Sequence, residues 1–198
     1  MIIKTVKIFP FFFLICTLIF GQSKSNLEII NELVDSSTSK IIAHLDDFQS
    51  TYKINLDSPQ EYFTLNQKVI NSFAEKGLKI DLDSSANTII YSLVKVGVEY
   101  TNLFKDGLLG GYLMERKTTI IGDFSFQKFA LISNADKFYF TVTDTINYEN
   151  YNYVENYSLP FTKGKAPDPP FLPSIFEPFV AITTVVVSVI LFFSVRTK

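Results

Sequence analysis

The sequence ends in a stretch that leaves few choices of structure. Residues 178–195 contain no charged side chain, and Arg196 and Lys198 follow at once. A helix rises about 1.5 Å per residue, so this run would be about 27 Å long, close to the hydrocarbon core of a bilayer. We therefore expect a transmembrane helix over 178–195. The basic tail 196–198 is then cytoplasmic, because positive residues concentrate on that side.

The first residues have the pattern of a secretory signal peptide. Two lysines precede an apolar core at residues 8–20, which small and polar residues follow. We expect a signal peptide at 1–21. Cleavage after Ser23 or Ser25, or an uncleaved N-terminal anchor, are the alternatives. Both ends then agree that the region between them is exported to the periplasm or the cell exterior.

Cys16 is the sole cysteine and lies inside the apolar core of the predicted signal peptide. Lipid-modified cysteines follow small residues, whereas bulky residues precede Cys16, so lipid attachment is disfavoured there. Removal of the signal peptide would leave a mature chain without cysteine. Such a chain has no disulfide, no thiolate nucleophile and no cysteine-bound metal.

The predicted exported part, residues 22–177, is acidic. It contains all 20 acidic residues but only 14 of the 18 basic ones, which gives a formal charge of −6. No basic block remains to neutralise phosphates, so binding to nucleic acid is disfavoured. The length suits one domain, residues 22–159, followed by a stalk.

The first half of the domain is predicted to contain two helices. Apolar residues spaced by three, four and seven predict a helix between residues 27 and 48. A short alternating strand is expected at residues 52–56. Ser58–Glu61 has the pattern of a capping box that begins a second helix, and Gly77 is a suitable residue to end it.

From residue 87 the chain is rich in β-branched and aromatic residues, which favour strands. Val94, Val96 and Val98 are expected on one buried face, Gly122 at a bulge, and residues 133–136 in a turn. We expect three long antiparallel strands, at residues 88–100, 112–132 and 137–143. The fold class is α+β, with two layers: two helices packed on a mostly antiparallel sheet of about four strands.

Proline sets residues 160–177 apart from the domain. Six of the eight prolines fall between Pro160 and Pro178. Proline removes a backbone donor and breaks helices and central strands, so we expect an extended, semi-stiff stalk.

The element order resembles the small α/β envelope domain shared by CsgG, LpoB and the N-terminal domain of TolB. Ala130–Val142, ALISNADKFYFTV, is similar to the hairpin of those families, in which a turn with Asp or Asn returns through an aromatic strand. The resemblance covers residues 26–145 and implies a fold and an envelope location. The tryptophan often present in the returning strand is absent, and no functional residue can be transferred.

Few residues could carry chemistry. His44 is the only histidine. Asp47 could orient it on a helix, but no nucleophile motif accompanies the pair, and a metal would need carboxylates alone. Asp81 and Asp83 lack the glycine and the closing glutamate of a calcium loop. We therefore expect a structural histidine, no cofactor, no metal and no enzymatic activity.

Two groups of residues are candidate interaction sites. A glycine-containing apolar loop could dock a partner, touch a membrane or fold back on the core; its members are Leu103, Phe104, Leu108 and Leu109. A tyrosine-rich stretch could bind a protein or a glycan, or lie along the sheet; its members are Tyr148, Tyr151 and Tyr153. The sequence predicts a membrane-anchored, non-catalytic envelope protein that docks to or assembles with another envelope component. The alternatives are a lipid- or glycan-binding module and a hydrolase that uses two convergent carboxylates.

Overall fold

The computed structural model describes residues 23–81, 87–107, 110–129, 131–168 and 173–195, with the last helix described at side-chain level from 179 to 194. The chain divides into two compact units, Met1–Ala166 and Pro167–Lys198. The predicted signal peptide 1–21, the tail 196–198 and the candidate residues Leu108 and Leu109 lie outside the described residues.

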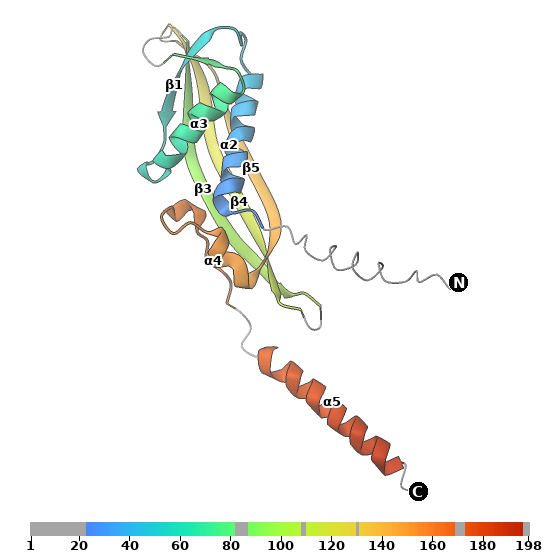
Figure 1. Ribbon diagram of the computed structural model, residues 1–198. Helices are drawn as coiled ribbons and strands as arrows, with labels where there is room; N and C mark the ends of the chain where they lie inside the picture. The colour runs from blue at the N-terminus through green and yellow to red at the C-terminus, as the bar shows by residue number, and fades with distance from the viewer. Residues whose placement is uncertain (1–22, 82–86, 108–109, 130, 169–172, 196–198) are drawn as a thin grey trace, which may run out of the picture. The chain divides into compact units, whose positions relative to one another are not determined.

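The first unit is built on a five-stranded sheet of order β2-β1-β3-β4-β5 (Figure 1). Its strands are β1 (Thr51–Asp57), β2 (Lys79–Ile80), β3 (Asn87–Lys105), β4 (Tyr112–Lys128) and β5 (Leu131–Asn147). β1 runs parallel to β2 and β3, and the long strands β3, β4 and β5 are antiparallel. The expected α+β class is confirmed. The fifth strand was missed because β2 has only two residues, too few for a sequence pattern.

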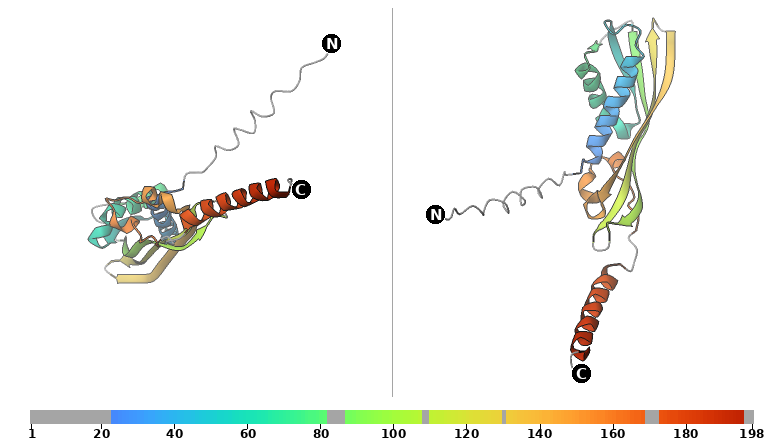
Figure 2. Two further views of the ribbon diagram at one scale, coloured as in Figure 1. Left: turned by 90° about the horizontal axis from the view of Figure 1, so that it is seen from below. Right: turned by 90° about the vertical axis from the view of Figure 1, so that its right-hand side faces the viewer.

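Two helices cover one face of this sheet, as the side view in Figure 2 shows. They are α2 (Asn26–Ala43) and α3 (Phe63–Glu75), the latter preceded by the 3-10 turn η2 (Gln60–Tyr62). Fully buried side chains join the two layers into one core, among them Ile30, Ile41, Phe73, Tyr91, Phe124 and Phe138. The expected two-layer packing is therefore present.

The two helix starts differ from the prediction. Ser25 and Glu28 form a reciprocal capping box at the start of α2, a pair that the apolar pattern did not reveal. The capping box expected at Ser58 is wrong, because Pro59 begins a 3-10 turn without a side-chain cap. Gly77 does end α3: its φ of 85° is left-handed, and Leu78 N–H donates to Phe73 O at 3.1 Å.

A bulge in β3 changes which valines are buried. Leu93 pairs with Gly122 and Lys95 with Ile121, so Val94 is the extra residue and is exposed, while Val96 and Val98 are buried. The predicted burial of Val94 is therefore wrong. A side-chain carbon at Gly122 would lie only 2.3 Å from the Phe138 ring, so only glycine fits there.

The predicted turn at residues 133–136 is also wrong. β4 ends at Lys128 and β5 begins at Leu131, so Ser133–Asp136 belong to β5. Asn134 has a φ of 47° and is the extra residue of a bulge in β5. The residues that favour turns also suit a bulge, which explains the wrong prediction. Asp136 is held by Lys40 of α2 at 2.8 Å.

The chain after β5 packs back on the domain through η3 (Tyr148–Asn150), α4 (Tyr151–Val154) and η4 (Pro160–Thr162). Phe161 and Thr162 are buried, and the compact unit extends to Ala166. Residues 160–166, expected in the stalk, are therefore part of the first unit. Proline fits the first turn of a helix, which explains why Pro160 does not prevent η4.

The second unit contains the helix α5 (Pro173–Val195). Over the residues that the structure describes, no helix meets the length and apolarity needed to cross a membrane, so the predicted transmembrane helix 178–195 is not supported.

Candidate functional site: the apolar hairpin tip

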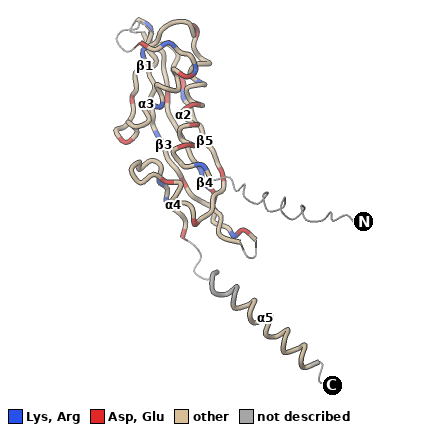
Figure 3. Tube along the Cα trace, in the orientation of Figure 1, with Lys and Arg blue, Asp and Glu red and all other residues tan. Residues whose placement is uncertain are grey.

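The turn between β4 and β5 carries three exposed apolar side chains. Phe129, Leu131 and Ile132 are 75, 74 and 68 per cent exposed; we call them the tip cluster. Acidic and basic residues are interspersed over the rest of this unit (Figure 3). Neighbouring apolar side chains that face water at a projecting turn are typical of binding surfaces.

Phe129 is also strained. Its φ of 50° lies in the left-handed region, which bulky residues rarely adopt. Glycine or asparagine is the usual residue at such a turn position. Phe129 therefore raises the free energy of the folded domain twice, through backbone strain and through exposed apolar area, and gains no core contact in return.

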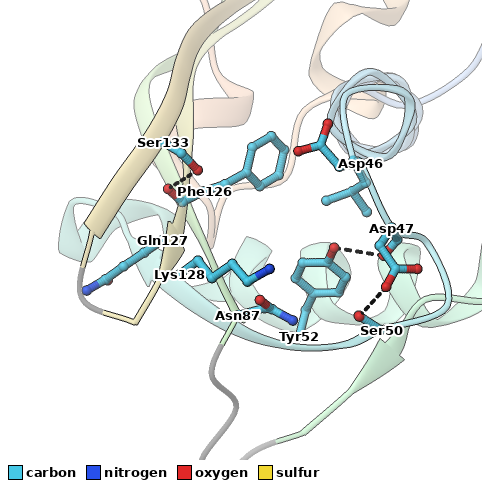
Figure 4. Close-up of a pocket in the computed structure, with 10 residues that line it drawn as sticks. Asp46, Asp47, Ser50, Tyr52, Asn87, Phe126, Gln127, Lys128 and Ser133 are labelled. Atoms are coloured by element: carbon cyan, nitrogen blue, oxygen red, sulfur yellow. Dashed lines mark hydrogen bonds between the residues drawn. The ribbon is translucent and has the colours of Figure 1, made fainter.

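A small polar pocket lies beside the tip, between the loop after α2 and the strand residues that flank the β4–β5 turn (Figure 4). Its volume is about 100 Å³, and its walls come from Leu45, Asp46, Asp47, Ser50, Tyr52, Asn87, Phe126, Gln127, Lys128 and Ser133. Lys128 extends its amino group into the opening from the hairpin side. This space suits a small polar group and is below the usual size of a site for a whole small-molecule ligand.

Hydrogen bonds fix the acidic wall of the pocket. The Ser50 hydroxyl and the Gln49 N–H both donate to the Asp47 carboxylate, which lowers the pKa of Asp47. Tyr52 donates to Asp47 O at 2.8 Å. Burial, together with the nearby carboxylates of Asp47 and Asp46, raises the pKa of the Tyr52 hydroxyl. Asp47 is thus a well-bonded carboxylate and has little basicity to contribute to catalysis.

His44 does not join Asp47 in a catalytic pair. It caps the C-terminus of α2, and its Nδ1 lies 2.8 Å from Lys40 O. Its ring packs edge-on against Phe124, and its Nε2 lies 4.0 Å from Asp136. Within the described ranges, no group of three or more His, Cys, Asp or Glu is placed to hold a metal.

Among the described residues, the loop residues expected to dock a partner do not form one exposed group. Leu103 is half-buried against the core, and Phe104 is 46 per cent exposed. The tyrosines also separate into two kinds. Tyr148 and Tyr151 pack together, with ring centroids 5.7 Å apart, whereas Tyr153 is exposed.

The tip cluster was missed because the sequence places its residues inside a strand. Residues 112–132 read as one uninterrupted β-prone segment, and neither glycine nor proline marks the turn. The length of that segment, 21 residues, is a weak signal of a turn: a usual strand has three to ten residues, but β3 runs over 19 without one.

A second polar cluster holds the opposite part of the sheet together. Arg116 is fully buried and donates to Asp144 Oδ1 at 2.8 Å, to Asn26 Oδ1 at 2.8 Å and to Lys24 O at 2.7 Å. Asn26 in turn donates to Tyr100 and to Thr162 O, both at 2.7 Å. These hydrogen bonds tie the start of α2, the three long strands and η4 together, which indicates a structural role.

The fold and the site together define an α+β domain with an exposed apolar hairpin tip. No protein family model matches the chain, and no curated protein matches it. Among solved structures it is similar to a minor lipoprotein from Acinetobacter baumannii, with a TM-score of 0.35 and 10% identity over 49% of this chain and 66% of that one. It is also similar to rare lipoprotein B from Shewanella oneidensis, with a TM-score of 0.33 and 18% identity over 48% and 68%.

Both of these solved structures are lipoproteins by name, and neither name is that of CsgG, LpoB or TolB. The chain spans about two thirds of the length of each.

Proposed function

We propose that this chain is a non-catalytic docking protein of the cell envelope, and that its tip cluster binds an apolar surface on a partner protein. The observation that carries the proposal is Phe129, which is both strained and exposed. Local strain persists at sites of function, where selection for binding outweighs its cost in stability. The small polar pocket beside it would take a single polar group of the same partner.

The envelope location is supported by the two chain ends. The N-terminal sequence has the pattern of an export signal. In α5, all the described side chains are exposed, and the apolar ones occur on every side of the helix. A helix that is apolar all round is stable when apolar surroundings cover it. We propose that lipid covers α5 and holds the chain at a membrane.

Site-specific photocrosslinking in the native host tests the tip. A photoreactive phenylalanine analogue at position 129 is expected to capture one partner protein. Position 63 is the matched control, because Phe63 is also an exposed phenylalanine but lies at the start of α3. Phe129→Asn should abolish co-purification of that partner with the full chain. Equal capture from positions 63 and 129, or co-purification that survives Phe129→Asn, would reject the tip as the docking site.

Alkaline extraction of membranes tests α5 separately. The full chain is expected to stay in the membrane pellet, and a chain ending at Pro167 to leave it. Replacing two exposed apolar residues, Ile190→Lys with Phe193→Lys, should release the chain, whereas Thr183→Ser should not. If the full chain is found in the soluble fraction, lipid contact by α5 is wrong, and the docking proposal can still be tested.

A further inference from the structure

Among the described residues of the first unit, no strand pairs with the outer edge of β5. β5 is the last strand of the sheet, and it runs over 17 residues, Leu131–Asn147. At the opposite side, β2 has only two residues, and Gly164 and Tyr62 cover the part of β3 beyond β1, next to the carbonyls of Val98 and Val96. An uncovered edge exposes backbone donors and acceptors that can pair with another strand.

In the part of the chain that the structure describes, the features that protect the β5 edge lie in its first part. Asn134 forms a bulge there, and the Lys40 amino group caps Lys137 O at 2.5 Å. Residues 138–143, FYFTVT, have neither proline nor glycine nor charge. Every one of them favours a strand, and none has a positive φ. This segment is regular, uncharged and suited to pairing.

We propose that β5 pairs antiparallel with β5 of a second copy of this chain, with Thr141 on the two-fold axis. The two five-stranded sheets would then form one continuous sheet. The docking surface at the hairpin tip is separate, so this inference does not depend on the proposed function.

The register follows first from the direction of the backbone groups. In an antiparallel pair, residues alternate between closely spaced pairs without mutual hydrogen bonds and hydrogen-bonded pairs. The hydroxyls of Thr119 and Thr141 lie only 3.2 Å apart across β4 and β5, as expected for the closely spaced kind. The backbone N–H and C=O of Thr141 therefore point away from β4, and so do those of Tyr139 and Thr143. The capping of Lys137 O by Lys40 agrees with this alternation.

Side-chain chemistry then selects the centre. With Thr141 on the axis, Phe140 faces Val142 of the other copy on the helix side of the sheet, where Val142 is still 36 per cent exposed. Aromatic and β-branched residues make favourable cross-strand pairs. If the two-fold axis passed through Phe140 instead, Asp136 would lie opposite Asp144 of the other copy. Repulsion between the two like charges disfavours that register. Centring on Tyr139 would pair Lys137 with Thr141, although Lys40 already caps the carbonyl of Lys137.

Two proline variants test both the pairing and its direction. Thr141→Pro removes an N–H that points to the free edge, which an edge strand tolerates. Val142→Pro removes an N–H that points toward β4 and belongs to the β4–β5 ladder. Light scattering of the full chain in detergent is expected to give a dimer for the wild type and a monomer for Thr141→Pro, with thermal unfolding preserved. Val142→Pro should lower the unfolding temperature.

A wild-type chain that is monomeric at every concentration would overturn the proposal. So would a dimer that Thr141→Pro leaves intact, or a Thr141→Pro chain as unstable as Val142→Pro, because its N–H would then belong to the β4 ladder.

Cysteine pairs test the register. In a Cys16→Ser background, Thr141→Cys should form a disulfide-linked dimer, because paired Cα atoms lie about 5.5 Å apart. Thr143→Cys is the matched control on the same strand face. Its two copies would lie about 13 Å apart along the strands, too far for a disulfide. Adding Tyr139→Cys to it should restore crosslinking. Equal crosslinking by the single variants at 141 and 143 would rule this register out.

Discussion

Replacing Arg116 by methionine should destabilise the domain by about 3 kcal/mol, although the side chain lies far from the tip. Methionine keeps much of the aliphatic volume and removes the guanidinium. Asn26 is fully buried, so its unpaired amide oxygen would cost about 2 kcal/mol. Lys24 is an exposed residue, and Asp144 is 38 per cent exposed. Their loss adds only about 1 kcal/mol together.

Urea unfolding of the full chain in mild detergent measures this loss. The chain has no tryptophan, so near-ultraviolet circular dichroism of its ten tyrosines reports on tertiary structure. With a slope of about 2 kcal/mol per molar urea, the midpoint should fall by about 1.5 M. Lys117→Met is the control on the adjacent, partly exposed position, and it should change stability by less than about 0.5 kcal/mol.

A double variant separates the cost of the unpaired Asp144 carboxylate from the other losses of stability in Arg116→Met. Arg116→Met with Asp144→Leu should recover less than about 1 kcal/mol, because the unpaired carboxylate is gone while Asn26 still lacks its donor. If Arg116→Met costs no more than Lys117→Met, the buried hydrogen bonds are not what joins α2 to the sheet.

Two further changes probe the helices by the same unfolding assay. Ser25→Ala should cost about 1 kcal/mol by removing the cap of α2, whereas Ser36→Ala, on the exposed side of α2, should cost little; equal effects would contradict the capping role. Burial would raise the pKa of Asp35, but hydrogen bonds from Lys68 and Ser72 outweigh it and the pKa is lowered. Asp35 thus contributes stability above the unfolded-state pKa, and that contribution is lost as the pH falls below about 4 through the folded-state pKa. Asp35→Asn should be less stable at neutral pH and lose less stability on acidification than the wild type. Glu32→Gln, in an exposed ion pair, should leave that profile unchanged.

The element order could be predicted from the sequence because periodicity reports burial. The stripes of α2 and α3, the alternation of β1 and the β-rich second half all follow from which residues avoid water. The burial of two hydroxyl residues of α2 could not be predicted from periodicity. Ser37 and Thr38 read as weak helix formers, yet both are buried, because Ser37 bonds Tyr91 at 2.9 Å and Thr38 bonds Ser72 at 2.7 Å. Such partners are distant in sequence, so local propensity cannot show them.

The hairpin tip escaped prediction for a different reason. Turn prediction looks for residues that stabilise turns, and Ser133–Asp136 matched that pattern although it lies within β5. The actual turn uses Phe129, a residue that destabilises it. Sequence rules describe what favours folding, so they fail where a residue is retained for another purpose. The same failure is what makes the tip informative about function.

The two ends of the long strands differ in hydrogen bonding, backbone strain and exposed apolar area. The Arg116 guanidinium and the Asn26 amide have hydrogen-bond partners inside the domain. β4 ends twelve residues further along, about 40 Å away at 3.3 Å per residue, and just beyond its end strain and exposed apolar area occur together at the tip. A domain selected only for stability would carry glycine or asparagine at position 129. Phe129→Asn should therefore raise the unfolding free energy by about 1 kcal/mol while it abolishes binding. A destabilised Phe129→Asn domain would show that Phe129 serves the fold, and the docking proposal would lose its main support.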